Sequence, residues 1–236
     1  MQELRQKFLL MLAGLLFVAR GFAQTSTPPN TPPTVSSQPS AEEEKRRLAV
    51  NPLTGVGAIS AADYHPLTPQ ERWKLYWKQN YWSVGAYTGP VASALVLDQA
   101  RGTPPEWGGG FPGYGRRLAS RLGSGIIQGT IQAPVAALMK CDVRYISSGQ
   151  QGFKRRAAHA VIYSFFTYNN EGHPRLNVPK LSGYYAGSAI STLWLPSHQN
   201  VVSHTLHDGS RQAGLSIAIN LLQEFWPDIQ TRLHHR

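Results

Sequence analysis

The chain of 236 residues carries 23 Lys and Arg against 13 Asp and Glu, so its formal net charge at pH 7 is +10. Its single cysteine excludes an intramolecular disulfide, and the fold has to be stable without one. The scarcity of acidic residues argues against hydrolases that need a pair of carboxylates.

Residues 1–23 have the pattern of a secretory signal peptide. Arg5 and Lys7 come before an apolar run at 8–19, and Gly21 and Ala23 are small residues at the two positions that a signal peptidase reads. The apolar run is too short to span a bilayer by itself. We therefore expect an exported protein that is located in the periplasm or associated with the outer membrane.

Residues 24–59 are predicted to form a disordered linker. The stretch 24–40 is dominated by Pro, Ser and Thr and has no apolar periodicity. It is followed by the charged run AEEEKRR at 41–47 and by the breakers Asn51 and Pro52. The remaining residues, 60–236, have the length of one domain.

From residue 60 onward the sequence predicts an all-α fold, a single compact bundle of about five helices. Thr68, Pro69 and Glu71 form a helix start, with a capping residue, a proline in the first turn and an acid after it. The aromatic residues that follow at 73–82 fit either core packing or a belt at a membrane interface. Further helical segments are expected at 83–102, 113–139, 154–168, 181–195 and 201–226. Pro134 predicts a kink or a new helix start, and Pro227 predicts that the last helix ends there or continues only briefly.

Small residues recur every four positions in several of these segments. In the segment 113–139, Gly125, Gly129 and Ala133 fall on one side of a helix. Comparable spacings occur at Gly85 and Gly89, at Gly183 and Gly187, and at Ser210, Gly214 and Ala218. Such stripes let helices approach closely, so we expect small-xxx-small packing faces within the bundle. A homo-oligomer built on the same Gly-rich faces is an alternative use of them.

The excess positive charge is concentrated at 113–180, where only Asp142 and Glu171 oppose the basic residues. For an exported chain, such a segment favours anionic lipid, lipopolysaccharide or an acidic polymer over nucleic acid. The residues predicted to bind the anion are Arg116, Arg117, Arg121, Arg144, Lys154, Arg155 and Arg156. The leading hypothesis is therefore a non-enzymatic cell-envelope protein that binds an anionic surface or lipid; a solvated basic surface is the alternative.

Two other functions compete with this hypothesis. Three stretches, 79–97, 122–139 and 181–203, lack charged residues, which fits an integral or oligomeric helical membrane component. The mean hydropathy of −0.28 instead favours a compact domain that lies on a membrane. His204, His207 and Asp208 lie on adjacent turns and are weak candidates for a metal-dependent enzyme. We expect no catalytic residues of a known motif and no cofactor.

Four motifs give the chain a resemblance to a family of uncharacterised exported proteins from acidobacterial-type genomes, over about residues 100–230. They are PPEWGGGFPGYGRR at 104–117, CDVRYISSG at 141–149, STLWLP at 191–196 and QEFWPDI at 223–229. The family usually has Asp-Pro-Arg-Tyr in the second motif, and Val143 replaces that proline here. The resemblance implies export and lends no activity. From the residues themselves we expect Asp142 and Arg144 to pair with each other or with Arg116 and Arg117, and so to serve as structural anchors.

Overall fold

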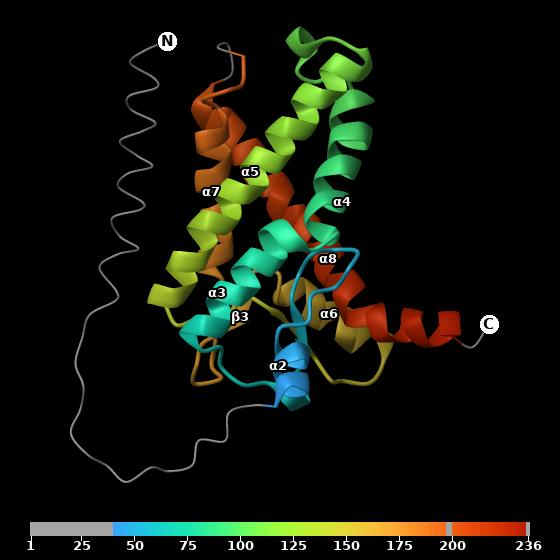
Figure 1. Cartoon of the computed structure of the whole chain (residues 1–236), viewed down its shortest axis with the longest axis vertical. Coiled ribbons are helices and arrows are strands. Elements are labelled where there is room, and N and C mark those ends of the chain that lie inside the picture. Colours follow the sequence, from blue (N-terminus) through green and yellow to red (C-terminus); the bar gives the residue numbers. More distant parts are fainter. Residues whose placement is uncertain (1–39, 197–199, 235–236) are drawn as a thin grey trace. The chain divides into compact units, whose positions relative to one another are not determined.

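The computed structural model of the chain describes residues 40–196 and 200–234, so the predicted signal peptide and residues 24–39 lie outside the described residues. The predicted all-α class is confirmed. Within these ranges the chain forms seven α-helices and two small two-stranded sheets. Figure 1 shows the long helices running side by side through the described part of the chain.

The first part of the described chain contains short elements. They are α2 (Ala41–Arg47), β1 (Ala58–Ser60), a 3-10 turn (Ala61–Asp63), α3 (Pro69–Trp77), α4 (Gly85–Ala92) and a second 3-10 turn (Pro105–Trp107). Wider π-helical turns extend α3 over Lys78–Trp82 and α4 over Ser93–Gln99. The capping box predicted for α3 is confirmed, because Thr68 and Glu71 exchange hydrogen bonds between side chain and backbone.

The second part contains the long helices. They are α5 (Gly110–Leu138), β2 (Tyr145–Ser147), α6 (Phe153–Ile162), β3 (Phe166–Tyr168), β4 (Pro174–Leu176), α7 (Val178–Ser191) and α8 (Val201–His234). Strand β1 pairs with β2 in parallel, with Ile59 opposite Ile146, and β3 pairs antiparallel with β4, with Thr167 opposite Arg175. These short sheets were not predicted, because three-residue strands leave almost no periodic signal.

Residues 41–59 are ordered, so the prediction of a disordered linker up to residue 59 is wrong for this part. Ser40 caps α2, whose acids occupy the first turn and whose bases occupy the last, as the helix dipole favours. Leu48 then packs with Leu67 and Leu75 in a buried cluster. The side chain of Asn51 bonds to Gln223 of α8 at 3.1 Å. The charged run is therefore a helix that begins the packed domain.

The two long helices with an internal proline each continue past it, so no new helix starts at Pro134 and the last helix has a short continuation after Pro227. Helix α5 continues through Pro134, and α8 continues through Pro227. A proline removes one backbone hydrogen bond, and a long helix retains its other turns and its packing against neighbours. Helix α5 packs along α7, and α7 packs on α8.

The small-residue stripes are packing faces inside the chain. A Cβ atom added at Gly187 would lie 2.5 Å from Cγ of Gln128, and one added at Gly129 would lie 2.0 Å from Oδ1 of Asn80. Helices α7 and α5 therefore approach as closely as glycine allows. Gly125 and Gly214 are different, because a Cβ atom added there would meet nothing within 4 Å. The homo-oligomer predicted from these stripes stays a prediction.

The aromatic residues of α3 and its extension are divided between packing and exposure. Tyr76, Trp77 and Tyr81 are half-buried, and the rings of Trp77 and Tyr81 lie 4.7 Å apart. Trp73 and Trp82 are 61% and 76% exposed. Among the described residues no helix is both long enough and apolar enough to cross a membrane.

Candidate functional site

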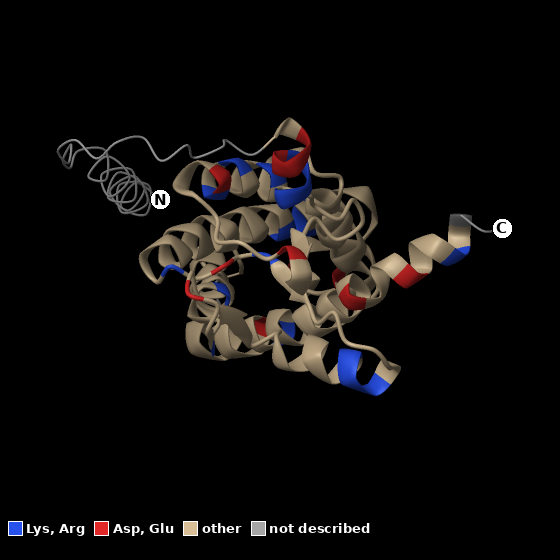
Figure 2. Cartoon of the chain, turned by 90° about the horizontal axis from the view of Figure 1, so that it is seen from below, with Lys and Arg blue, Asp and Glu red and all other residues tan. Residues whose placement is uncertain are grey.

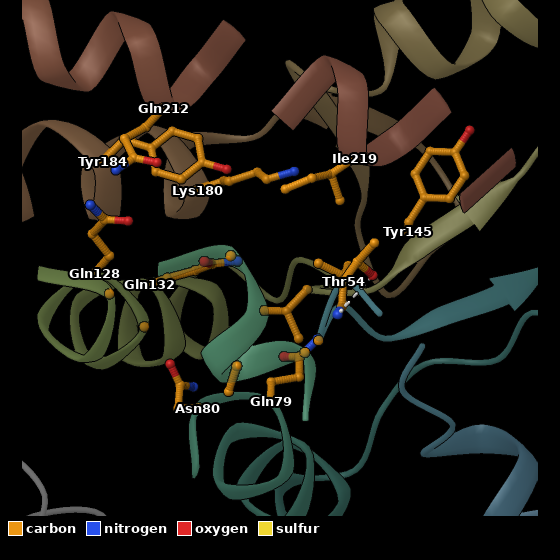
Figure 3. Close-up of a pocket in the computed structure, with 18 of the residues that line it drawn as sticks. Thr54, Gln79, Asn80, Gln128, Gln132, Tyr145, Lys180, Tyr184, Gln212 and Ile219 are labelled. Atoms are coloured by element: carbon orange, nitrogen blue, oxygen red, sulfur yellow. Dashed lines mark hydrogen bonds between the residues drawn. The ribbon is translucent and has the colours of Figure 1, made fainter. Parts of the chain in front are cut away.

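A cavity of about 500 Å³ lies among the helices, and Figure 3 shows part of its lining. Tyr76 of α3 and Gly85 of α4 contribute to one side. Gln128 of α5, Lys180 of α7 and Gln212 of α8 contribute to the others. No Asp or Glu is among the described residues that line it. The cavity therefore offers hydrogen-bond donors, amide groups and aromatic rings to a ligand. Its described lining has no carboxylate that could neutralise a bound cation.

Several amide side chains in the lining have no partner within the described chain. In the described chain no hydrogen bond is formed by the side-chain amides of Gln79, Gln128, Gln132 and Gln212. Two lining atoms, Nε2 of Gln128 and Oδ1 of Asn220, are buried without a partner in the described chain. Buried polar atoms normally have partners, so their presence here indicates a site that water or a polar ligand completes.

Lys180 supplies an amino group to this cavity. Its side chain extends from the first turn of α7 into the space between α7, α8 and α5 (Figure 3). Asn177 caps the helix, with Oδ1 accepting from the backbone N–H of Lys180 at 3.2 Å. A cation in a first turn opposes the helix dipole. This position is therefore unfavourable for stability, as functional positions often are.

No described residue forms an ion pair or a hydrogen bond with the Lys180 amino group. Burial lowers the pKa of Lys180 to about 8. Three arginines also line the cavity, and each is already engaged: Arg72 with Cys141 O and Asn170 Oδ1, Arg121 with Asp98, and Arg144 with Asp142. Lys180 is therefore the lining residue whose charge is left for a ligand.

Arg144, one of the predicted anion-binding residues, is a structural anchor. It is 4% exposed, and its Nη2 lies 2.7 Å from Oδ2 of Asp142, which confirms the expected pair. The guanidinium also donates to the backbone oxygens of Arg47 and His65. The pair thus connects the segment after α5 to α2 and to the chain before α3.

Arg121 and Arg117 are likewise used within the fold. Arg121 donates to Asp98 with two bonds of 2.6 and 2.7 Å and to Asp208 at 3.1 Å. Arg117 is 1% exposed and donates to the backbone oxygens of Thr103, Pro104 and Gly108. It therefore fixes the Gly/Pro loop before α5. The prediction that Arg117, Arg121 and Arg144 present their charge to an external partner is wrong, because acids or carbonyls inside the fold already bind them.

The other predicted residues lie nearer the surface. Arg116, Lys154 and Arg155 are exposed, and no described residue forms an ion pair or hydrogen bond with them. Arg156 instead donates to Asp228 at 2.6 Å and contacts Glu224. Figure 2 shows lysines and arginines interspersed with acidic residues along the described chain. Because Arg117, Arg121, Arg144 and Arg156 are engaged within the fold, only part of the charge of the basic segment 113–180 is left for an external partner.

The predicted metal candidates do not form a metal centre. Arg121, Arg211 and Ser188 all donate to the carboxylate of Asp208. Although burial alone raises the pKa of Asp208, the two arginines lower it below its ordinary value. His204 lies next to Ser191, 3.3 Å from Nε2 to Oγ. Within 40–196 and 200–234, no group of three His, Cys, Asp or Glu is placed to hold a metal ion.

Glu224 of the QEFWPDI motif is an internal acceptor. It is 2% exposed and accepts from the hydroxyl of Tyr145 at 2.7 Å and from the backbone N–H of Ser148. Burial raises its pKa, but these hydrogen bonds lower it further than burial raises it. Tyr145 belongs to the Asp-x-Arg-Tyr motif, so two of the quoted motifs contact each other directly. Their role in the fold is to hold β2 against α8.

Comparisons with protein-family models, with curated proteins and with solved structures find no match to this chain. The resemblance to exported proteins of the acidobacterial type accordingly stays a prediction. What the site can bind has to be inferred from its own geometry.

Proposed function

We propose that the chain is a binding protein that holds a small anionic molecule in the cavity at Lys180. The observation that carries this proposal is the amino group of the half-buried Lys180, which has no counter-ion among the described residues in a cavity lining without Asp or Glu. Partial burial already disfavours a charge without a partner, so we infer that a ligand of opposite charge neutralises the cation in this position.

The amides around Lys180 narrow the class of ligand. Gln128, Gln132 and Gln212 offer both N–H donors and C=O acceptors, and Tyr184 adds an aromatic face (Figure 3). A carboxylate with further hydroxyl, carbonyl or amide groups would satisfy them. The cavity of about 500 Å³ also has the size of a small-molecule site.

This proposal keeps the anionic partner predicted from the sequence and moves its binding site from the predicted basic residues to the cavity at Lys180. Export to the cell envelope stays a prediction. The proposal needs no metal, because the amino group of Lys180 supplies the positive charge that an anionic ligand requires.

Filling the cavity tests the proposal with little risk to the fold. We expect Gly125→Leu to abolish ligand binding, because Gly125 lines the cavity and a Cβ atom added there meets nothing within 4 Å. Replacing a helix glycine by leucine is also favourable for the helix by about 0.8 kcal/mol. The measurement is the rise in Tm produced by acetate, pyruvate, lactate, gluconate or inorganic phosphate at pH 7.

The matched control is Gly214→Leu, which adds the same side chain to an exposed helix position outside the cavity. At least one of the anions should stabilise the wild type and Gly214→Leu equally, and should leave Gly125→Leu unchanged. The proposal is wrong if none of these anions stabilises the wild type, or if Gly125→Leu responds as the wild type does.

A second candidate function is peripheral binding to an anionic membrane. The observation in its favour is the first turn of α6, where Lys154 and Arg155 are exposed next to Phe153, which is 72% exposed. Basic residues in a first turn oppose the helix dipole, so the fold gains nothing from them there.

For this second candidate we expect Lys154→Glu combined with Arg155→Glu to reduce binding to vesicles of phosphatidylglycerol and phosphatidylcholine at least tenfold at low salt. Arg116→Glu is the single-site comparison. Equal sedimentation of the double variant and the wild type with vesicles would rule out this use of α6.

A further inference from the structure

We propose that Lys180 forms a reversible imine with the carbonyl carbon of a 2-oxo carboxylate bound in the cavity. This inference rests on the proposed function, because it names the substrate class of the same site. The observation that carries it is an amino group without a carboxylate partner in the same cavity as amides that have no partner in the described chain.

The cavity gives the two ends of such a ligand different surroundings. The carboxylate of the ligand can accept from the amide N–H groups of Gln128 and Gln132, and Nε2 of Gln128 is a buried donor without a partner in the described chain. The proposal requires that the carbonyl carbon of the ligand face Lys180, which lines the same cavity. Larger 2-oxo acids with polar substituents would also engage Gln212 and Asn220.

The step is balanced without an oxidant or a reductant. The unprotonated nitrogen of Lys180 attacks the carbonyl carbon and forms a C–N bond, and the carbonyl oxygen takes up a proton to give a carbinolamine. The nitrogen loses a proton, and the hydroxyl leaves with a proton as water. One amine and one carbonyl compound therefore give one imine and one water, and the reverse reaction releases the ligand.

The surroundings of Lys180 favour the unprotonated amine that this step needs. No carboxylate lines the cavity to hold the ammonium form, and the N-terminus of α7 disfavours a positive charge. The lowered pKa of about 8 agrees with this geometry. Compared with a lysine of ordinary pKa, the unprotonated fraction at pH 7 is larger by a factor on the order of 100.

The experiment traps the imine by reduction. The full chain is incubated with pyruvate at pH 7.5, treated with sodium borohydride and digested, and the modified lysines are mapped by mass spectrometry. Lactate, which lacks the carbonyl group, is the probe for binding without reaction. Lys180→Arg keeps a positive charge and loses the nucleophile, and Lys154→Arg is the control at an exposed lysine.

We expect modification of Lys180 to exceed that of Lys154 at least tenfold, to disappear in Lys180→Arg and to persist in Lys154→Arg. Stabilisation by both pyruvate and lactate without modification of Lys180 would overturn the imine and leave the proposed function standing. Failure of both pyruvate and lactate to stabilise the wild type, together with no adduct on Lys180, would overturn the imine and count against the proposed function. Modification spread evenly over the lysines would overturn the imine as well.

Discussion

Replacing Lys180 with methionine is expected to stabilise the folded chain at pH 7 by about 1–3 kcal/mol and to abolish anion binding. The stabilisation arises because methionine has a similar length and brings no charge into a half-buried position that lacks a counter-ion among the described residues. Loss of function with a gain in stability is the result expected of a residue kept for its ligand. Urea unfolding of both proteins at pH 7 measures the first effect.

The pH dependence of the free energy of unfolding tests independently whether the charge of Lys180 destabilises the fold. The pKa of Lys180 is about 8 in the folded chain, against 10.5 for an ordinary lysine, so between these values the unfolded chain binds more protons. The stability of the wild type therefore rises with pH across this window. The advantage of Lys180→Met should shrink accordingly by pH 10.5. An equal or larger advantage at pH 10.5, or a destabilised variant at pH 7, would contradict the account.

Removing the carboxylate of Asp142 is expected to have the largest cost in stability. Asp142→Ala leaves the fully buried guanidinium of Arg144 without its counter-ion, and breaking such a pair typically costs about 3–5 kcal/mol. The bonds from Arg144 to the backbone of Arg47 and His65 should weaken with it. The free energy of unfolding from urea titration is the measurement.

Two comparisons separate this effect from a general effect of removing a carboxylate. Asp228→Ala breaks an ion pair whose acid is 49% exposed and should cost less than about 1 kcal/mol. The double variant Asp142→Leu with Arg144→Leu removes both charges and should be more stable than Asp142→Ala alone. A double variant less stable than the single one would show that the buried charge is not the source of the loss.

The helical class and the start of α3 were predictable from the sequence because they depend on neighbouring residues. The capping box of Thr68 and Glu71 and the glycine spacing that lets α7 approach Gln128 are both visible within a few positions. The helix α2 was missed although its charges are arranged as the dipole favours. A charged heptapeptide has no apolar stripe, and the helix is recognised only once Leu48 is seen to be buried.

The site was less predictable, because burial depends on contacts between distant residues. Arg121 looked like an exposed cation, and only the fold brings Asp98 and Asp208 to it, from 23 and 87 residues away. Lys180 stood among the basic residues of the segment 113–180 without being a predicted ligand-binding residue. Its position after Asn177 and Pro179, in the first turn of a helix, was the available signal.

The central claim is that the amino group of Lys180 binds an anion in the cavity. Calorimetric titration of the wild-type chain with gluconate at pH 7 and at pH 9.5, beside Lys180→Met at pH 7, tests it most directly. The account predicts binding at pH 7, at least tenfold weaker binding at pH 9.5, where the amine loses its charge, and no binding by the variant. Equal affinity at both pH values, or retained binding by Lys180→Met, would contradict it.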